Sequence, residues 1–120
     1  MKDASLTLYH NPRCSKSRAT NQILEQQGIE ADVVEYLKDT PSPAELDTLC
    51  AKLGLEPQQI IRSKEKRFKE LGLSLKDDRS REAWLKVLSE NPVLIERPIF
   101  VKGDKAVIGR PPENVLELLG

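Results

Sequence analysis

The residues of this sequence that are best suited to chemistry surround Cys14. Residues 9–18 read Tyr-His-Asn-Pro-Arg-Cys-Ser-Lys-Ser-Arg, so one histidine and three cationic side chains lie within four positions of the thiol. The nucleophilic form of a cysteine is the thiolate, and nearby positive charge lowers the pKa of the thiol. An inert buried cysteine would have apolar neighbours, which this one lacks. We therefore interpret Cys14 as a nucleophile and Arg18 as a cation that supports its thiolate.

The predicted secondary structure places this thiol at the start of a helix. Alternating apolar and polar residues predict a strand over residues 6–9, and apolar residues at helical spacing predict a helix over residues 15–27. The first turn of a helix has free backbone N–H groups and a partial positive charge, which stabilise a thiolate and bind oxyanions. Asn11 and Ser15 belong to the same segment and are included as candidates for oxyanion binding.

Histidine and arginine residues are further candidates for a role in thiolate chemistry and oxyanion binding. His10 is the only histidine, and it either holds the loop or favours ionisation of Cys14. Arg62, Arg97 and Arg110 come from separate parts of the chain and carry the planar, always charged group that grips oxyanions with two hydrogen bonds. Taken singly, each of these arginines is typical of a solvated or ion-paired surface residue, and spacing alone does not bring them to the thiol.

The second cysteine, Cys50, has a different environment. It shares an apolar stripe with Leu46, Leu49 and Leu53, which indicates a place in the core. The two cysteines form neither a C-x-x-C motif nor a spacing typical of metal ligands, so we expect reduced thiols, no metal and no bound cofactor.

The composition limits the classes of partner. Lysine plus arginine equals aspartate plus glutamate at 19 each, and this balance argues against a nucleic-acid surface. The N-terminal residues lack the pattern of a secretion signal, and no apolar run has the length of a membrane-spanning helix. We expect one cytoplasmic domain over residues 1–120, without a nucleic-acid or membrane partner.

The predicted elements follow the order β-α-β, a helical block, then β-β-α. Residues 33–36 predict a second strand, and residues 99–101 and 106–108 predict a hairpin. The helical block occupies about residues 42–91, with Ser42 and Ser80 as predicted helix caps. Within it, short helices are predicted from Pro57 and over residues 64–71. The last helix of the chain follows Pro111. The residues predicted to face inward from the first helix, the Ser80 helix and the last helix are Ala19, Ile23, Leu24, Trp84, Val87, Leu88, Val115, Leu116 and Leu119. Without the block, this order is the thioredoxin arrangement, so we predict an α/β thioredoxin-like fold with a helical insertion.

Four motifs together resemble a known family. They are His10-x-x-x-Cys14-x-x-x-Arg18, Arg62, Glu96-Arg97-Pro98-Ile99 and Gly109-Arg110-Pro111-Pro112. This combination is similar to that of the glutaredoxin-coupled arsenate reductases, the ArsC family, over nearly the whole chain.

The resemblance implies a mechanism. The cysteine matching Cys14 attacks arsenate, and arginines matching Arg62, Arg97 and Arg110 hold the oxyanion. Glutathione as co-substrate and glutaredoxin as partner protein then supply the reducing equivalents. The resemblance also implies a cis bond between Arg97 and Pro98.

Three other functions are alternatives to arsenate reduction. A phosphatase of the Cys-x5-Arg type is excluded because position 20 is threonine. A non-enzymatic regulator resembling the Spx proteins would not need the three arginines. A glutathione-dependent thiol reductase on the same scaffold is not separated from arsenate reduction by the sequence.

Overall fold

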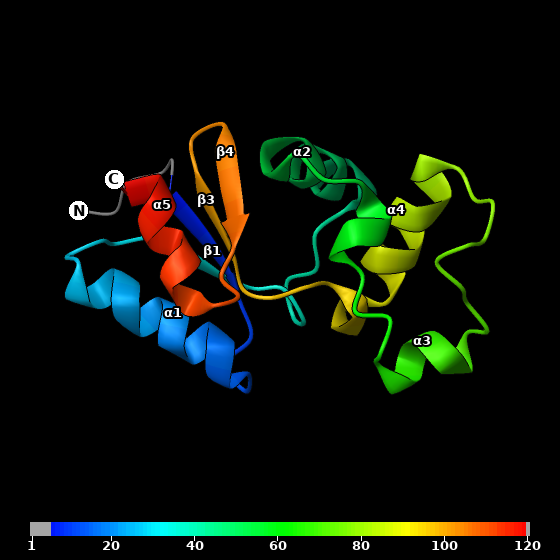
Figure 1. Cartoon of the computed structure of the whole chain (residues 1–120), viewed down its shortest axis with the longest axis horizontal. Coiled ribbons are helices and arrows are strands. Elements are labelled where there is room, and N and C mark those ends of the chain that lie inside the picture. The colour runs from blue at the N-terminus through cyan, green and yellow to red at the C-terminus, as the bar shows by residue number, and fades with distance from the viewer. Residues whose placement is uncertain (1–5, 120) are drawn as a thin grey trace. The chain divides into compact units, whose positions relative to one another are not determined.

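The computed structural model describes residues 6–119 (Figure 1). The contacts divide this part of the chain into two compact units, one formed by residues 6–39 with 97–119 and the other by Thr40–Glu96. The predicted helical insertion at 42–91 falls inside the second unit. The first unit contains all the strands of the described sheet, and the second is built from helices.

The first unit is a four-stranded sheet with helices. Its elements are β1 (Leu6–His10), α1 (Ser15–Gln26), β2 (Asp32–Glu35), β3 (Ile99–Lys102), β4 (Lys105–Ile108), the 3₁₀ helix η3 (Pro112–Val115) and α5 (Leu116–Leu119). The strand order is β2-β1-β3-β4, with β1 parallel to β2 and the other two pairs antiparallel. The predicted β-α-β and β-β-α halves are both present, which is the thioredoxin-like arrangement.

One face of this sheet forms the core of the first unit. Leu6, Leu8 and Phe100 point to this face, where they pack against Leu24 of α1 and Val115 of η3. Figure 1 shows α1 and α5 lying beside the sheet, and residues of both helices pack against this cluster. Burial of this cluster fixes α1 against the sheet and therefore fixes the loop that joins β1 to α1.

Helix α1 is more polar on its inner face than the sequence predicts. Its buried residues are Ser17, Thr20 and Leu24, whereas Ala19 and Ile23 are only half-buried. The helix ends where predicted, because Gly28 adopts the left-handed conformation with φ of 72°. A buried serine and threonine in the first half of α1 indicate that this end of the helix serves polar contacts.

The second unit consists of short helices. They are α2 (Pro43–Leu53), η1 (Pro57–Ile60), α3 (Lys66–Glu70), α4 (Arg81–Glu90) and η2 (Pro92–Leu94). Ser42 caps α2 in a capping box with Glu45, and the Ser80 side chain caps α4, as the sequence predicts. An isolated antiparallel bridge joins Ile61 to Ile95 within this unit.

Some predicted boundaries and burials are wrong. The helix expected over residues 64–71 is shorter, η2 was not predicted, and Leu85 rather than Val87 is fully buried on α4. Leu116 is exposed because the last helix begins as a 3₁₀ turn, which changes the angular spacing of its side chains. No helix in the described part of the chain is both long and apolar enough to cross a membrane.

Candidate active site

Cys14 is the N-cap residue of α1. Its backbone is extended, with φ of −92° and ψ of 124°, and its carbonyl oxygen accepts the first helical hydrogen bond from the Arg18 N–H at 3.0 Å. At its other end, the Cys14 N–H donates to the Asn11 carbonyl at 2.9 Å, closing the turn that follows β1. An N-cap side chain faces the N–H groups of the second and third helical residues. The fold therefore places the sulfur where a capping oxygen would normally lie.

The surroundings of the thiol favour its ionised form. Burial alone would raise the pKa of Cys14, but the backbone N–H of Ser17, the Arg97 guanidinium and the backbone N–H of Lys16 lower it. The net effect is a pKa below the ordinary value, and the thiol is only partly exposed. The predicted direction of the shift is confirmed. The helix N-terminus contributes as expected, and the side-chain contribution to the lowered pKa comes from Arg97 rather than from Arg18, which the sequence suggested.

A buried hydrogen-bond chain holds the start of α1 against the end of β1. The Asn11 N–H donates to Ser17 Oγ at 2.9 Å, and Ser17 Oγ lies 2.6 Å from His10 Nδ1. Since Ser17 Oγ accepts from the backbone, its own proton is available to donate to an unprotonated Nδ1. All three residues are at most 7% exposed. The chain fixes Ser17, whose backbone N–H lowers the pKa of Cys14.

His10 is suited to this structural contact in its neutral form. Burial lowers the pKa of His10, the Glu35 carboxylate raises it, and Arg18 lowers it, so that the net pKa is below the ordinary value. Of the two roles left open by the sequence, the geometry favours holding the loop. Arg18 contributes to the same loop, since its guanidinium donates to the Pro12 carbonyl at 2.9 Å.

Asn11 and Ser15 occupy different positions in this loop. The Asn11 side-chain oxygen accepts from the Arg13 N–H at 3.0 Å, so this side chain organises the turn. Ser15 is the first residue of α1 and is exposed beside the thiol. The predicted role of both residues in oxyanion binding stays a prediction.

Two arginines from the C-terminal half of the chain meet the thiol. The terminal Nη2 of Arg110 lies 3.6 Å from Cys14 Sγ, and Arg110 Nε donates to the Arg97 carbonyl at 2.7 Å. The Arg97 guanidinium is near enough to lower the pKa of Cys14. The Arg97–Pro98 bond is cis, as the resemblance implies, and the Arg110–Pro111 bond is also cis. Thus two arginines that are far from Cys14 in the sequence supply permanent positive charges at its thiol.

Gly109, the residue before Arg110, lies very close to neighbouring segments of the fold. Gly109 lies so near α1 and the Pro98 ring that an added Cβ would be 2.7 Å from Thr20 Oγ1 and 2.8 Å from Pro98 Cγ. Its N–H donates to the Pro98 carbonyl at 2.9 Å, and the Asn114 side chain donates to the Arg110 carbonyl at 3.0 Å. Only glycine fits at position 109 without displacement of these neighbours.

The third predicted arginine belongs to the second unit. Arg62 follows η1, and its backbone N–H donates to the Leu94 carbonyl at 2.7 Å. Its guanidinium forms an ion pair with Glu65 at 3.1 Å. Its predicted convergence with Arg97 and Arg110 stays a prediction.

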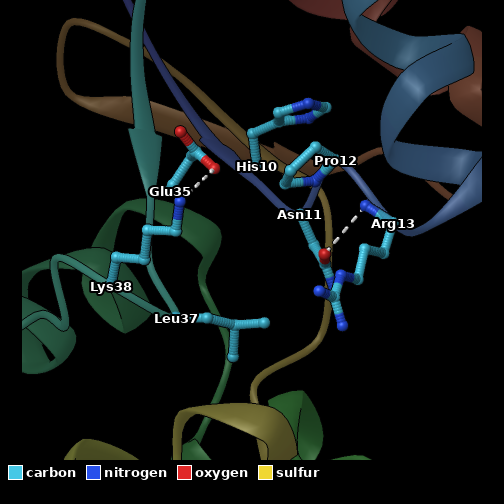
Figure 2. A pocket seen from close by; sticks show the side chains of 7 residues that line it. All are labelled: His10, Asn11, Pro12, Arg13, Glu35, Leu37 and Lys38. Carbon is cyan, nitrogen blue, oxygen red and sulfur yellow. Dashed lines mark hydrogen bonds and ion pairs between the residues drawn. The ribbon is translucent and has the colours of Figure 1, made fainter.

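A small cavity adjoins the cysteine loop within the first unit. It has a volume of about 280 Å³ and lies between the residues that follow β1 and those that end and follow β2. Figure 2 shows Arg13 on one wall and the Glu35–Lys38 ion pair, at 3.9 Å, on the other. Because Arg13 directly precedes Cys14, a molecule in this cavity would lie beside the cysteine loop.

Cys50 and the possible metal ligands of the described residues do not form a site like that around Cys14. Cys50 is fully buried in α2, as predicted, and burial raises the pKa of its thiol. Among residues 6–119, no group of three or more histidine, cysteine, aspartate or glutamate side chains is arranged to hold a metal ion.

Sequence reasoning missed two contributors to this site, Ser17 and Gly109. The buried hydroxyl of Ser17 had no recognisable signal, because a serine inside a polar run is typical of a helix surface. Gly109 lies inside the Gly-Arg-Pro-Pro motif, but the need for a glycine appears only in the fold, where its backbone lies against Thr20 and Pro98.

The fold and the site define a thioredoxin-like protein with a thiol of lowered pKa at a helix N-terminus. The profile of the ArsC family matches residues 9–118. An arsenate reductase of Haemophilus influenzae is 47% identical over 116 residues, which span 96% of this chain and 99% of that protein. An arsenate reductase of Neisseria meningitidis is 43% identical over 115 residues, spanning 95% and 97%. The solved structure of an arsenate reductase from Vibrio cholerae is 47% identical, has a TM-score of 0.89 and matches 96% of this chain and 98% of that one. This chain belongs to the ArsC family.

Proposed function

We propose that this protein is an arsenate reductase in which Cys14 is the nucleophile. The observation that carries the proposal is the thiol of lowered pKa at the N-terminus of α1, with Arg110 at 3.6 Å and Arg97 close by. Arsenate is an anion near neutral pH, and these two guanidinium groups offset its repulsion from a thiolate. The names of the relatives agree with this substrate.

In the first step, the Cys14 thiolate attacks arsenic. An As–S bond forms and one As–O bond breaks, and the departing oxygen takes up protons and leaves as water. Arg97 and Arg110 stabilise the charge that gathers on the remaining oxygens in the transition state. Arg62 is proposed as a third contact to these oxygens, with the family motif as its support.

In the second step, we infer that glutathione is the reductant. Its thiolate attacks Cys14 Sγ, the S–As bond breaks, and the bonding electron pair passes to arsenic. Pentavalent arsenic is thereby reduced to trivalent arsenite, and Cys14 and glutathione are left as a mixed disulfide. A thiolate of glutaredoxin then attacks the glutathione sulfur, which regenerates the Cys14 thiolate.

The cavity beside the cysteine loop supports this choice of reductant. Glutathione carries two carboxylates and one ammonium group. The cavity offers the cations Arg13 and Lys38 together with the carboxylate of Glu35. This mixed charge suits a zwitterionic peptide better than a neutral thiol.

The test is arsenite formation by the purified protein with arsenate, glutathione and glutaredoxin. We expect turnover that needs all three components. Absence of arsenite with the complete system contradicts the proposal. In that case, reduction of a glutathione mixed disulfide by the same preparation would identify a thiol reductase, whereas inactivity in both assays would favour a binding protein.

A further inference from the structure

Tyr36 lies next to the cysteine loop through the register of the sheet. It directly follows β2, in which Glu35 pairs with His10 of β1. The next pair along the same register would be Tyr36 and Asn11. Tyr36 is fully buried and is among the largest buried side chains of the protein. The end of β2 therefore delivers an aromatic side chain to the interior beside the residues that lead to Cys14.

The hydroxyl group of Tyr36 is buried close to residues of the proposed oxyanion site. It makes no hydrogen bond of good geometry within the described part of the chain. Burial raises the pKa of Tyr36, while the Arg97 guanidinium and the Asn11 side chain are near enough to lower it in part, and Cys14 also raises it. The hydroxyl is consequently neutral at physiological pH and lies close to Arg97, Asn11 and Cys14.

This placement is costly for the fold alone. A buried hydroxyl without a well-aligned partner destabilises a protein, and phenylalanine would fill the same space without that cost. Residues that violate a stability rule of this kind are expected at functional sites. The guanidinium beside this hydroxyl has only donor groups, so the tyrosine oxygen is the natural acceptor for one of them.

We propose that Tyr36 is a positioning residue of the oxyanion site, and that its hydroxyl oxygen accepts a hydrogen bond from Arg97 and so directs that guanidinium toward Cys14 and its substrate. The proposal deepens the arsenate reductase proposal and rests on it for the identity of the anion. The hydroxyl acts through Arg97 and takes no part in bond making.

The test is the Tyr36→Phe variant, which keeps the ring and removes only the hydroxyl. We expect kcat/KM for arsenate to fall roughly three- to tenfold, the effect of losing one ordinary hydrogen bond, because the hydroxyl acts only through Arg97 and does not contact the substrate. We also expect the pKa of Cys14, measured from iodoacetamide alkylation against pH, to rise by about 0.3–1 unit because Arg97 is held less firmly.

A double-mutant comparison separates positioning from a merely structural role. In the Arg97→Ala background, Tyr36→Phe should leave the pKa of Cys14 unchanged, because the group through which Tyr36 acts is absent. Tyr9→Phe is the matched control and should alter neither the thiol pKa nor turnover. An unchanged thiol pKa in Tyr36→Phe, or an equal shift with and without Arg97, overturns the proposal.

The alkylation measurement needs no arsenate. If wild type fails to reduce arsenate but Tyr36→Phe shifts the thiol pKa only when Arg97 is present, the proposed substrate is wrong and the positioning role stands. If wild type is active and the shift is missing, the positioning role is wrong and the proposed function stands.

Discussion

At the scale of single residues, the site depends on the state of two titratable groups. Cys14 is made acidic by backbone N–H groups and Arg97, and His10 is kept neutral by burial. The N–H groups that act on the sulfur belong to the first turn of α1, which the His10–Ser17 contact holds in place. We therefore expect the histidine to support the thiolate by holding the loop rather than by a positive charge.

Replacement of the nucleophile should abolish turnover. Cys14→Ser is expected to retain less than about 1% of wild-type arsenate reduction, since a serine hydroxyl is not ionised at neutral pH and cannot form the disulfide. Cys50→Ser is the control and should keep most of the activity, because that thiol is buried in the core and its pKa is raised. Loss of activity in a folded Cys50→Ser variant would show that a second thiol takes part. Arsenite release measures both.

Protonation of the single histidine should weaken the fold. The pKa of His10 is lowered in the folded protein, so the unfolded chain binds a proton first as the pH falls. The free energy of unfolding should therefore decrease as the pH is lowered from the ordinary histidine pKa of about 6.5 toward the lowered folded value. Urea denaturation at a series of pH values would measure this slope. In His10→Gln the slope over this interval should disappear, and a persistent slope would assign it to carboxylates.

At the scale of elements, loops at the ends of strands build the site. The residues after β1 carry the nucleophile, those before β3 carry Arg97, and those after β4 carry Arg110. Gly109 lets the last of these segments pass Thr20 and Pro98. The close approach of Gly109 to α1 therefore links the position of this helix to that of Arg110.

Gly109→Ala should damage both stability and the site. The added methyl group would be within 3 Å of two neighbours, so the segment must shift, at a cost of about 1–3 kcal/mol. We expect a lower melting temperature and a lower kcat/KM because Arg110 moves from Cys14. Gly28→Ala is the control, since its strained φ of 72° also costs stability but lies at the far end of α1. Equal effects on kcat/KM at equal stability loss would argue against a role in positioning.

The cavity beside the cysteine loop gives a prediction about the reductant. Lys38→Glu should raise the KM for glutathione roughly two- to fivefold, a modest effect because this lysine is exposed. The KM for arsenate should stay unchanged. Lys86→Glu on α4 makes the same charge change and should affect neither constant. An equal change of both KM values in Lys38→Glu would contradict a separate glutathione subsite.

At the scale of the whole molecule, the two units differ in what they supply. The first unit contains the nucleophile, Arg97, Arg110 and the cavity, and the second contains Arg62. In the sequence, the helices of the second unit are inserted between β2 and β3 of the first unit. If Arg62 contributes to oxyanion binding, both units are needed for full activity.

Arg62→Ala tests this contribution. We expect kcat/KM for arsenate to fall roughly ten- to a hundredfold, the loss of one charge-assisted contact. Arg67→Ala is the control within the same unit, since its guanidinium contacts Asn91 instead. If Arg62→Ala has wild-type kinetics, Arg62 does not contribute to oxyanion binding. This conclusion holds whatever the effects of replacing Arg97 and Arg110.

Local sequence patterns determined most elements and the position of Cys14 at the start of a helix. Apolar alternation, capping serines and glycines after helices depend only on neighbouring residues, so β1, α1, α2 and α4 were predictable. The position of Cys14 between strand and helix has the same local origin, and it predicted the direction of the thiol pKa. The resemblance of the motifs to the ArsC family added the expectation that Arg97 and Arg110 act with Cys14.

Only the tertiary structure decided which distant groups face the thiol. Tyr36 follows the strand that pairs with β1 and lies near Asn11, and the close approach of Gly109 to Thr20 and Pro98 accompanies the placement of Arg110 within 3.6 Å of the sulfur. The inner face of α1 is polar at Ser17 because a buried histidine lies opposite it, which no pattern within the helix reveals. These features depend on side chains from strands that are separated along the chain, and a pattern of near neighbours contains no information about such pairings.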